Sequence, residues 1–160
     1  MFLIAFTGNK GSGKDTASEA LTLSDFEKLA FSQPLKEGLS KMLDIDIGYF
    51  ENPNLKESKI DYLGITPRYL MQTLGTDWGR NMISNTLWID LMRKKLSQRK
   101  GRNIVISDVR FNSEAELVKE FGGKIIKISR AGSNDPGNHE SELGIDQTLI
   151  DEEIVNKNSI

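Results

Sequence analysis

The sequence predicts an α/β fold in which a mostly parallel β-sheet is flanked by helices. Residues 2–7 and 103–110 are short runs rich in apolar residues, too short for a globular helix but suited to a strand. A strand that is apolar on both faces is typical of a parallel sheet, because helices cover both sides. From residue 15 the apolar spacing becomes helical. The predicted inner side of this helix consists of Ala17, Ala20 and Leu21, and its polar side of Ser18 and Glu19.

A glycine-rich turn connects this first strand to the first helix. Gly8, Gly11 and Gly13 permit dihedral angles and close approaches that a Cβ atom would block, so the loop can turn its N–H groups toward a polyphosphate. The helix directs its positive dipole end at the same anion, and Lys14 reaches the β- and γ-phosphates. Strand, glycine-rich turn and helix together predict a P-loop. Its predicted phosphate-binding residues are Gly8, Lys10, Gly11, Ser12, Gly13, Lys14, Asp15 and Thr16.

Asp15 occupies the position after the lysine, where a Ser or Thr hydroxyl normally contacts Mg²⁺. The next hydroxyl belongs to Thr16. Two interpretations remain open. Asp15 holds the metal directly or through water while Thr16 contacts a phosphate, or Asp15 is only a favourable negative charge in the first turn of a helix.

Composition narrows the class of protein. The 160 residues suit a single domain, with 38% apolar residues, 28% charged residues and a net charge of −2. Six Lys and Arg residues within 93–102 follow an apolar helical stretch, which favours a solvated helix end over a nucleic-acid surface. The apolar runs are too short for a membrane span, and the first lacks the features of a signal peptide. The absence of cysteine excludes disulfides and fits a cytoplasmic protein.

Between the two apolar strands we expect mainly helices. Residues 26–31 form a predicted short strand, and Ser32 caps a helix that has Pro34 in its first turn. Residues 44–54 are predicted to be irregular, and residues 55–63 to form a polar helix. The apolar face of the helix after Ser32 consists of Leu35, Leu39, Met42 and Leu43, and Lys36 near its start is either exposed or a phosphate contact.

The next predicted helix begins at Pro67, is capped by Thr66 and ends or is interrupted at Gly75. Arg68 and Gln72 lie four residues apart and therefore share a helix face. An arginine and an amide on one face are suited to a phosphate and a base edge, although such a pair is also common on solvated surfaces.

Trp88 lies in a predicted helix over residues 87–96, as a core aromatic residue or as a wall for a stacked base. Asp108 and Arg110 follow the second apolar strand and point to the same side of it. Parallel sheets bind ligands at the carboxyl ends of their strands, so this acid and this arginine are predicted to be functional, with a structural ion pair as the alternative.

The last third of the chain repeats the pattern of helix and strand. A helix begins near Glu114, whose side chain is predicted to face the region of the preceding acid and arginine. Residues 124–129 form a third strand and 152–155 a short last one. Residues 131–144 are polar and glycine-rich, which predicts a loop or lid. His139 lies there without cysteine or other histidine partners, which argues against a metal site.

Four motifs carry a family resemblance. They are Gly8 to Thr16 with its Gly-Ser-Gly-Lys-Asp-Thr ending, Arg68 to Arg80 with its Gln-x-Leu-Gly-Thr-Asp core, Asp-Val-Arg-Phe-Asn-x-Glu over residues 108–114, and the Gly-Gly strand ending at Arg130. In this order they resemble the deoxynucleoside monophosphate kinases of bacteriophages over nearly the whole chain.

The resemblance implies a three-layer P-loop kinase fold and transfer of the γ-phosphoryl group of ATP to a deoxynucleoside 5′-monophosphate, with Mg²⁺ and often as a dimer. It implies one domain over residues 1–160, with an acceptor-binding helical insertion at about 33–100 and a short lid at about 131–144. The lid contains no arginine, so the arginine that stabilises the transition state would be Arg110 or Arg130. A closing helix is expected after the last strand, where the sequence ends.

Roles follow from the matching positions. The implied catalytic residues are Lys14, Arg68, Asp108 and Arg110; Arg130 joins the P-loop residues at the donor nucleotide, and Asp15 holds the metal. The candidate acceptor-site residues, with Lys36 as an additional phosphate contact, are Lys36, Arg68, Gln72, Gly75, Thr76, Trp88, Asp108, Arg110 and Glu114.

Three other functions fit these motifs less well. Phosphomevalonate kinases share the Gly-Lys-Asp ending, so another small-molecule P-loop kinase is the nearest alternative. A nucleotide-dependent switch that hydrolyses ATP without an acceptor is disfavoured by the arginine-containing motifs. A dinucleotide-binding domain is disfavoured because Gly11-x-Gly13-x-x-Thr16 lacks the third glycine.

Overall fold

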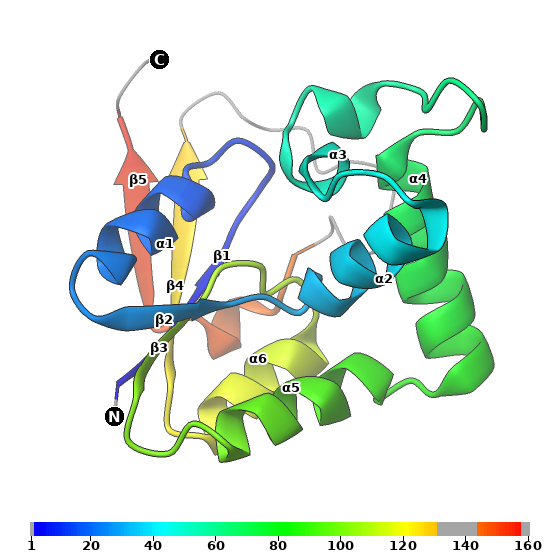
Figure 1. Cartoon of the computed structure of the whole chain (residues 1–160). Coiled ribbons are helices and arrows are strands. Elements are labelled where there is room, and N and C mark those ends of the chain that lie inside the picture. Colours follow the sequence, from blue (N-terminus) through cyan, green and yellow to red (C-terminus); the bar gives the residue numbers. More distant parts are fainter. Residues whose placement is uncertain (1, 131–143, 158–160) are drawn as a thin grey trace. The chain divides into compact units, whose positions relative to one another are not determined.

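Five parallel strands form one sheet in the order β2–β3–β1–β4–β5. The computed structural model describes residues 2–130 and 144–157 (Figure 1). The parallel arrangement confirms the predicted α/β class with helices beside the sheet. The strands are β1 (Leu3–Thr7), β2 (Phe26–Leu29), β3 (Asn103–Ile106), β4 (Lys124–Arg130) and β5 (Glu152–Asn156).

The apolar runs of the sequence occupy the centre of the sheet. β1 pairs with β3 on one side and β4 on the other, and Ala5 is fully buried. Ile104, Val105 and Ile106 of β3 are also fully buried, which explains why this strand is continuously apolar. The edge strand β5 carries charge instead, and its Glu153 forms an ion pair with Lys127 of the neighbouring β4.

Helices α1 (Lys14–Thr22) and α6 (Asn112–Glu120) cover the two faces of the sheet (Figure 1). The crossovers from β1 to β2 and from β3 to β4 run in opposite directions along the strand order. Because such crossovers are right-handed, their helices lie on opposite faces. α1 packs against β1, β2 and β3, and α6 against β1 and β4. A short 3₁₀-helix, η4 (Gln147–Leu149), precedes β5.

The predicted inner side of α1 was partly wrong. Ser18 is fully buried, whereas Ala20 is exposed. Ser18 Oγ donates a hydrogen bond to the carbonyl oxygen of Asp15 at 2.8 Å. The buried hydroxyl therefore has its hydrogen-bond partner within its own helix. Apolar spacing could not predict this, because a serine that bonds within its own helix behaves as a small core residue.

The basic cluster of the sequence is engaged in ion pairs within the sheet unit. Arg99 Nε lies 2.6 Å from Glu27 Oε1, and Arg102 Nη1 lies 3.0 Å from Glu27 Oε2. The hydrogen bond from Arg99 is the main cause that lowers the pKa of Glu27. Arg93 pairs with Glu120 of α6. These pairs give three of the six basic residues a structural role, which the predicted solvated helix end did not include.

Contacts divide the chain into two compact units, one of residues 1–31 and 92–160 and one of residues 32–91. The second unit is helical. It contains α2 (Gln33–Leu43), α3 (Gly48–Glu51), the 3₁₀-helix η1 (Leu55–Glu57), α4 (Pro67–Gln72), the π-helix η2 (Thr73–Ile83) and the start of α5 (Leu87–Ser97). None of the helices among residues 2–130 and 144–157 is long and apolar enough to cross a membrane.

Several predictions for this unit were wrong in detail. Residues 44–54 contain α3, which begins where Asp46 Oδ1 accepts the N–H of Gly48 at 2.7 Å and which buries Phe50 completely. Residues 55–63 contain only one 3₁₀ turn instead of a helix. Met42, expected on the apolar face of α2, is 66% exposed.

Gly75 does not end the helix that begins at Pro67. Thr66 caps that helix as predicted, its side chain accepting the N–H of Tyr69, but from Thr73 the helix continues with π geometry. Trp88 Nε1 donates to the carbonyl oxygen of Gly75 at 2.8 Å. A π-helical stretch inside a helix often marks a functional segment, and a single glycine in the sequence did not reveal it.

Gly79 should tolerate no larger residue. A Cβ atom at Gly79 would lie 2.4 Å from the buried ring of Trp88, whereas one at Gly38 in α2 would have no atom within 4 Å. Gly79→Ala should therefore lower the free energy of unfolding by about 1–3 kcal/mol through overpacking. Gly38→Ala, the matched control, should raise it by about 0.5–1 kcal/mol. Urea denaturation measures both, and equal effects of the two substitutions would contradict the packing.

Candidate active site

The loop between β1 and α1 needs glycine at positions 8 and 13, both for the backbone dihedral angle and for lack of space. Gly8 and Gly13 have φ angles of 135° and 109°. A Cβ atom at Gly8 would lie 2.1 Å from the carbonyl oxygen of Ile128 in β4, and one at Gly13 would lie 2.9 Å from Nδ2 of Asn156 in β5. The loop is thus seated directly on the ends of β4 and β5. Gly11 has a φ of 74° but open space around it, so only its dihedral angle requires glycine.

Lys14 is buried and holds the loop together. Its ammonium group donates to the carbonyl oxygens of Gly8 and Asn9, each at 2.7 Å, and lies 3.5 Å from Ser12 Oγ. An ammonium inside a loop of this kind is placed to exchange main-chain oxygens for phosphate oxygens.

The electrostatic surroundings of Lys14 come from the loop and from the segment after β3. The pKa of Lys14 is lowered to about 8, mainly by burial and secondly by the positive charge of Arg110. The carboxylates of Asp15 and Asp108 oppose this shift. The structure therefore brings together three predicted site residues around the lysine, within one compact unit. A buried cation next to a second cation favours an anionic ligand.

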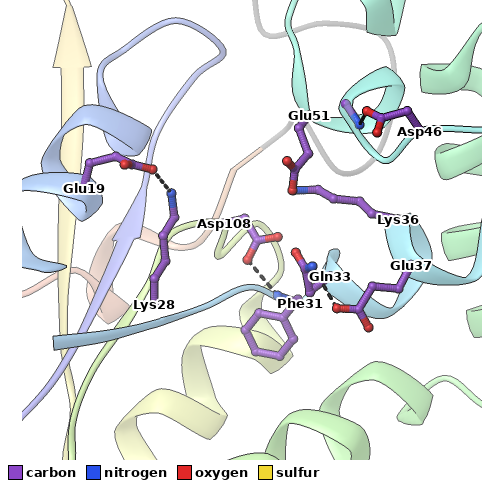
Figure 2. Close-up of polar contacts among 10 residues, drawn as sticks. Glu19, Lys28, Phe31, Gln33, Lys36, Glu37, Asp46, Glu51 and Asp108 are labelled. Atoms are coloured by element: carbon purple, nitrogen blue, oxygen red, sulfur yellow. Dashed lines mark hydrogen bonds and ion pairs between the residues drawn. The ribbon is translucent and has the colours of Figure 1, made fainter. Parts of the chain in front are cut away.

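Two carboxylates fix the main chain that carries Arg110. Asp108 Oδ1 accepts the N–H of Phe31 at 2.8 Å, which ties the segment after β2 to that after β3 (Figure 2). Glu114, almost fully buried, accepts the N–H groups of Arg110 at 2.8 Å and Phe111 at 3.2 Å through Oε2. Their direct contact with a substrate stays a prediction.

β3 is shorter than predicted, because its ladder ends at Ile106. The predicted alternation nevertheless holds beyond that point, since Val109 is buried while Asp108 and Arg110 are half-buried. The N–H of Val109 bonds to the carbonyl oxygen of Phe6, which keeps this segment beside the end of β1.

Arg130 is the last residue of β4, so it lies at the same edge of the parallel sheet as the loop after β1. The lid predicted for residues 131–144 falls, except for Gly144, outside the described residues. The exposed side chains of Asp15 and Thr16 lie in the first turn of α1.

The predicted acceptor residues before residue 92 belong to the helical unit. Arg68 Nε bonds to Glu57 Oε1 at 2.7 Å, and Lys36 Nζ lies 3.9 Å from Glu51 Oε1 (Figure 2). The side chain of Lys36 is only 16% exposed, so it is more buried than a solvated lysine. The remaining members are half-buried Gln72, Gly75 and Thr76, and buried Trp88.

Sequence reasoning missed Asn156, which ends β5 and contacts the loop. Its Nδ2 donates to the carbonyl oxygen of Ser12 at 3.1 Å. The available signal was a polar amide directly after Ile154 and Val155, at the carboxyl end of a predicted strand.

Comparison with known proteins adds the family. The family model described as deoxynucleotide monophosphate kinase matches residues 57–160. A protein of Acanthamoeba polyphaga mimivirus, provisionally named deoxynucleotide monophosphate kinase, is 37% identical over 162 residues, which covers 89% of this chain and 81% of that protein. The chain belongs to the deoxynucleotide monophosphate kinase family. This confirms the resemblance seen in the sequence motifs.

Other members and similar structures differ in length from this kinase. The deoxynucleoside-5′-monophosphate kinase of Escherichia phage T5 is 29% identical over 142 residues, covering 84% of this chain and 55% of that protein. A solved structure from Chloroflexus aurantiacus, provisionally described as a kinase, has a TM-score of 0.44 at 18% identity, covering 82% of this chain and 60% of that one. This family member therefore spans about half of the T5 enzyme.

Nucleotide binding at alkaline pH should take up a proton. At pH 9 a lysine with a pKa of about 8 is roughly nine-tenths neutral, and nearby phosphates raise its pKa in the complex. Calorimetric titration with ATP at pH 9, in two buffers of different ionisation heat, should therefore show uptake of about 0.5–0.9 proton per site. Lys14→Arg, which stays charged at this pH, should show none. A wild-type binding heat that is independent of the buffer would contradict this pKa.

Proposed function

We propose that this protein transfers the γ-phosphoryl group of ATP to a deoxynucleoside 5′-monophosphate and yields ADP and the deoxynucleoside diphosphate. The buried ammonium of Lys14 inside a glycine loop at the end of β1 carries the proposal, because it matches a triphosphate tail in charge and position. Membership of the deoxynucleotide monophosphate kinase family supports the acceptor.

The reaction asks for positioning and charge stabilisation. An oxygen of the acceptor phosphate forms a bond to the γ-phosphorus, and the bond from that phosphorus to the β–γ bridging oxygen breaks, leaving its electron pair on ADP. The acceptor phosphate is already a nucleophile at neutral pH, so no general base is needed. Loop N–H groups and the ammonium of Lys14 would hold the donor, and Arg110 is proposed as the arginine that stabilises the transferring group.

The helical unit is proposed to bind the acceptor. Arg68 would exchange its contact with Glu57 for the acceptor phosphate, and Gln72, on the same helix face, would contact the base. Trp88 is better suited to support the π-helix than to stack on a base, because its ring is buried and its N–H bonds to Gly75.

Asp15 is the proposed protein ligand of Mg²⁺. Its exposed carboxylate lies in the first turn of α1 and acts electrostatically on Lys14. Carboxylate oxygen suits Mg²⁺, which usually takes one or two protein carboxylates and completes its shell with phosphates and water. Once bound there, the ion would neutralise charge on the β- and γ-phosphates.

The proposed place of action is the cytoplasm, and it is the host cytoplasm if this chain is virus-encoded like its relatives from mimivirus and phage T5. Nucleotides are the proposed partners, together with a second copy of the chain as a homodimer. Pairing of Arg99 and Arg102 with Glu27 supports the proposal that nucleic acid is not a partner.

The choice of acceptor can be tested directly. With ATP and Mg²⁺, ADP formation should depend on an added deoxynucleoside monophosphate, and a panel of the four common ones with their ribonucleotide counterparts defines base and sugar selectivity. Mevalonate phosphate should give no ADP above background. Equal ADP formation with and without any nucleotide acceptor would overturn the proposal in favour of a nucleotide switch.

Lys14→Ala should lower kcat/KM by about 10²–10³-fold, the usual effect of removing one preorganised charge contact at a transferring group. Lys28→Ala is the control. Lys28 is another lysine of the same unit, lies outside the loop and pairs with Glu19 at 2.8 Å (Figure 2). The kcat/KM of this variant should stay within about twofold of wild type. Steady-state assays of both variants decide, and near-normal turnover of Lys14→Ala would refute the scheme.

Arg68→Ala should raise the KM for the acceptor by about tenfold or more, since a charge-assisted contact to phosphate is lost. The KM for ATP should be unchanged, because Arg68 belongs to the proposed acceptor site. Arg93→Ala, which removes an arginine paired with Glu120, is the control and should leave both KM values within about twofold. An effect of Arg68→Ala on ATP alone would assign this arginine to the donor instead.

A further inference from the structure

The carbonyl oxygens of the glycine loop need hydrogen-bond donors on the side away from the phosphate. A loop that turns its N–H groups toward a phosphate points the attached carbonyl oxygens away from it, and each of these needs a donor. The carbonyl oxygens of Gly8 and Asn9 accept the ammonium of Lys14. The carbonyl oxygen of Ser12 accepts Nδ2 of Asn156, from a strand 144 residues further along the chain.

The position of Asn156 is set by the sheet. It is the last residue of β5 and pairs in register with Arg130, the last residue of β4. A carbonyl oxygen can only accept, so the amide nitrogen of Asn156 must be the group that faces Ser12. The same nitrogen lies 2.9 Å from the position that a Cβ atom of Gly13 would take, which is too close for a larger residue there. Asn156 therefore bonds to Ser12 and limits the space beside Gly13, the two residues that share this peptide bond.

We infer that Asn156 is a positioning residue of the phosphate-binding loop, a role that rests on the proposed binding of the ATP triphosphate. In a planar trans peptide the C=O and N–H groups point in opposite directions. Holding the carbonyl oxygen of Ser12 toward β5 therefore aims the N–H of Gly13 away from β5, to the side where the phosphate binds. Asn156 fixes the orientation of a phosphate ligand without touching the phosphate.

The hydrogen bond from Asn156 to Ser12 and the hydrogen bonds of Lys14 should respond differently when ATP binds. The ammonium must leave the carbonyl oxygens of Gly8 and Asn9 if it is to reach a phosphate, so these two bonds belong to the empty loop. The amide of Asn156 carries no charge and has no reason to leave Ser12. Its hydrogen bond persists in both states, and its contribution is to preorganise the loop.

Asn156→Ala and Asn156→Asp test the inference, with calorimetric binding of ATP and Mg²⁺ as the readout. Removing the donor should weaken ATP binding by about threefold to tenfold. Asp has the same size but no donor, and its charge faces the carbonyl oxygen and the bound phosphates, so it should weaken binding by about a further tenfold. The acceptor KM at saturating ATP should stay within about twofold for both variants. The control is Glu153→Ala, which lies on β5 like Asn156 and removes only the ion pair with Lys127 of β4. This variant should bind ATP as the wild type does.

The charge of Asp would weaken ATP binding whatever the role of Asn156, so the Ala variant carries the distinction. A merely structural role would lower the melting temperature of Asn156→Ala and leave the ATP affinity of the folded variant unchanged. If Asn156→Ala fails to fold, Asn156→Asp, which preserves the packing against Gly13, still tests the inference. ATP affinity within twofold of wild type in either folded variant, or a loss equal to that of Glu153→Ala, overturns the inference. Failure of the proposed function has another signature, namely a wild-type protein that binds ATP without acceptor-dependent formation of ADP.

Discussion

Burial of a single ammonium group is the constraint on which the site depends. Lys14 is removed from water, and the main-chain oxygens of Gly8 and Asn9 replace part of the solvation that it loses. The compensation is incomplete, because burial and Arg110 still lower its pKa. A polyphosphate would supply the missing negative charge, which supports the proposed binding of ATP by this loop.

The sheet provides the rigidity that such a loop needs. Its central strand is buried and paired on both sides, and the loop rests on the ends of β4 and β5 through Gly8 and Gly13. Asp108 and Glu114 hold the neighbouring main chain after β3 by accepting its N–H groups and that of Phe31. Charged groups at the strand ends are thus fixed by elements whose own stability comes from apolar burial.

The sequence predicted what depends on short-range patterns. Continuous apolar runs gave β1 and β3, and glycine spacing before Lys14 gave the loop. Part of what it missed depends on contacts between residues far apart in the sequence. The π-helix is fixed by Trp88 reaching back to Gly75, and the contact of Asn156 with Ser12 joins residues 144 positions apart. Local periodicity carries no information about such pairs, and likewise could not show that Ser18 enters the core by bonding within its own helix.

The most direct test of the central claim is an amide NMR titration of the folded, isotope-labelled protein with ATP and Mg²⁺. If the loop N–H groups bind the triphosphate, the amide protons of Gly11, Gly13 and Lys14 should shift downfield more than those of any other segment, in step with saturation. Loop resonances that stay unchanged while ATP binds elsewhere, or a folded protein whose spectrum does not respond to ATP, would contradict the account.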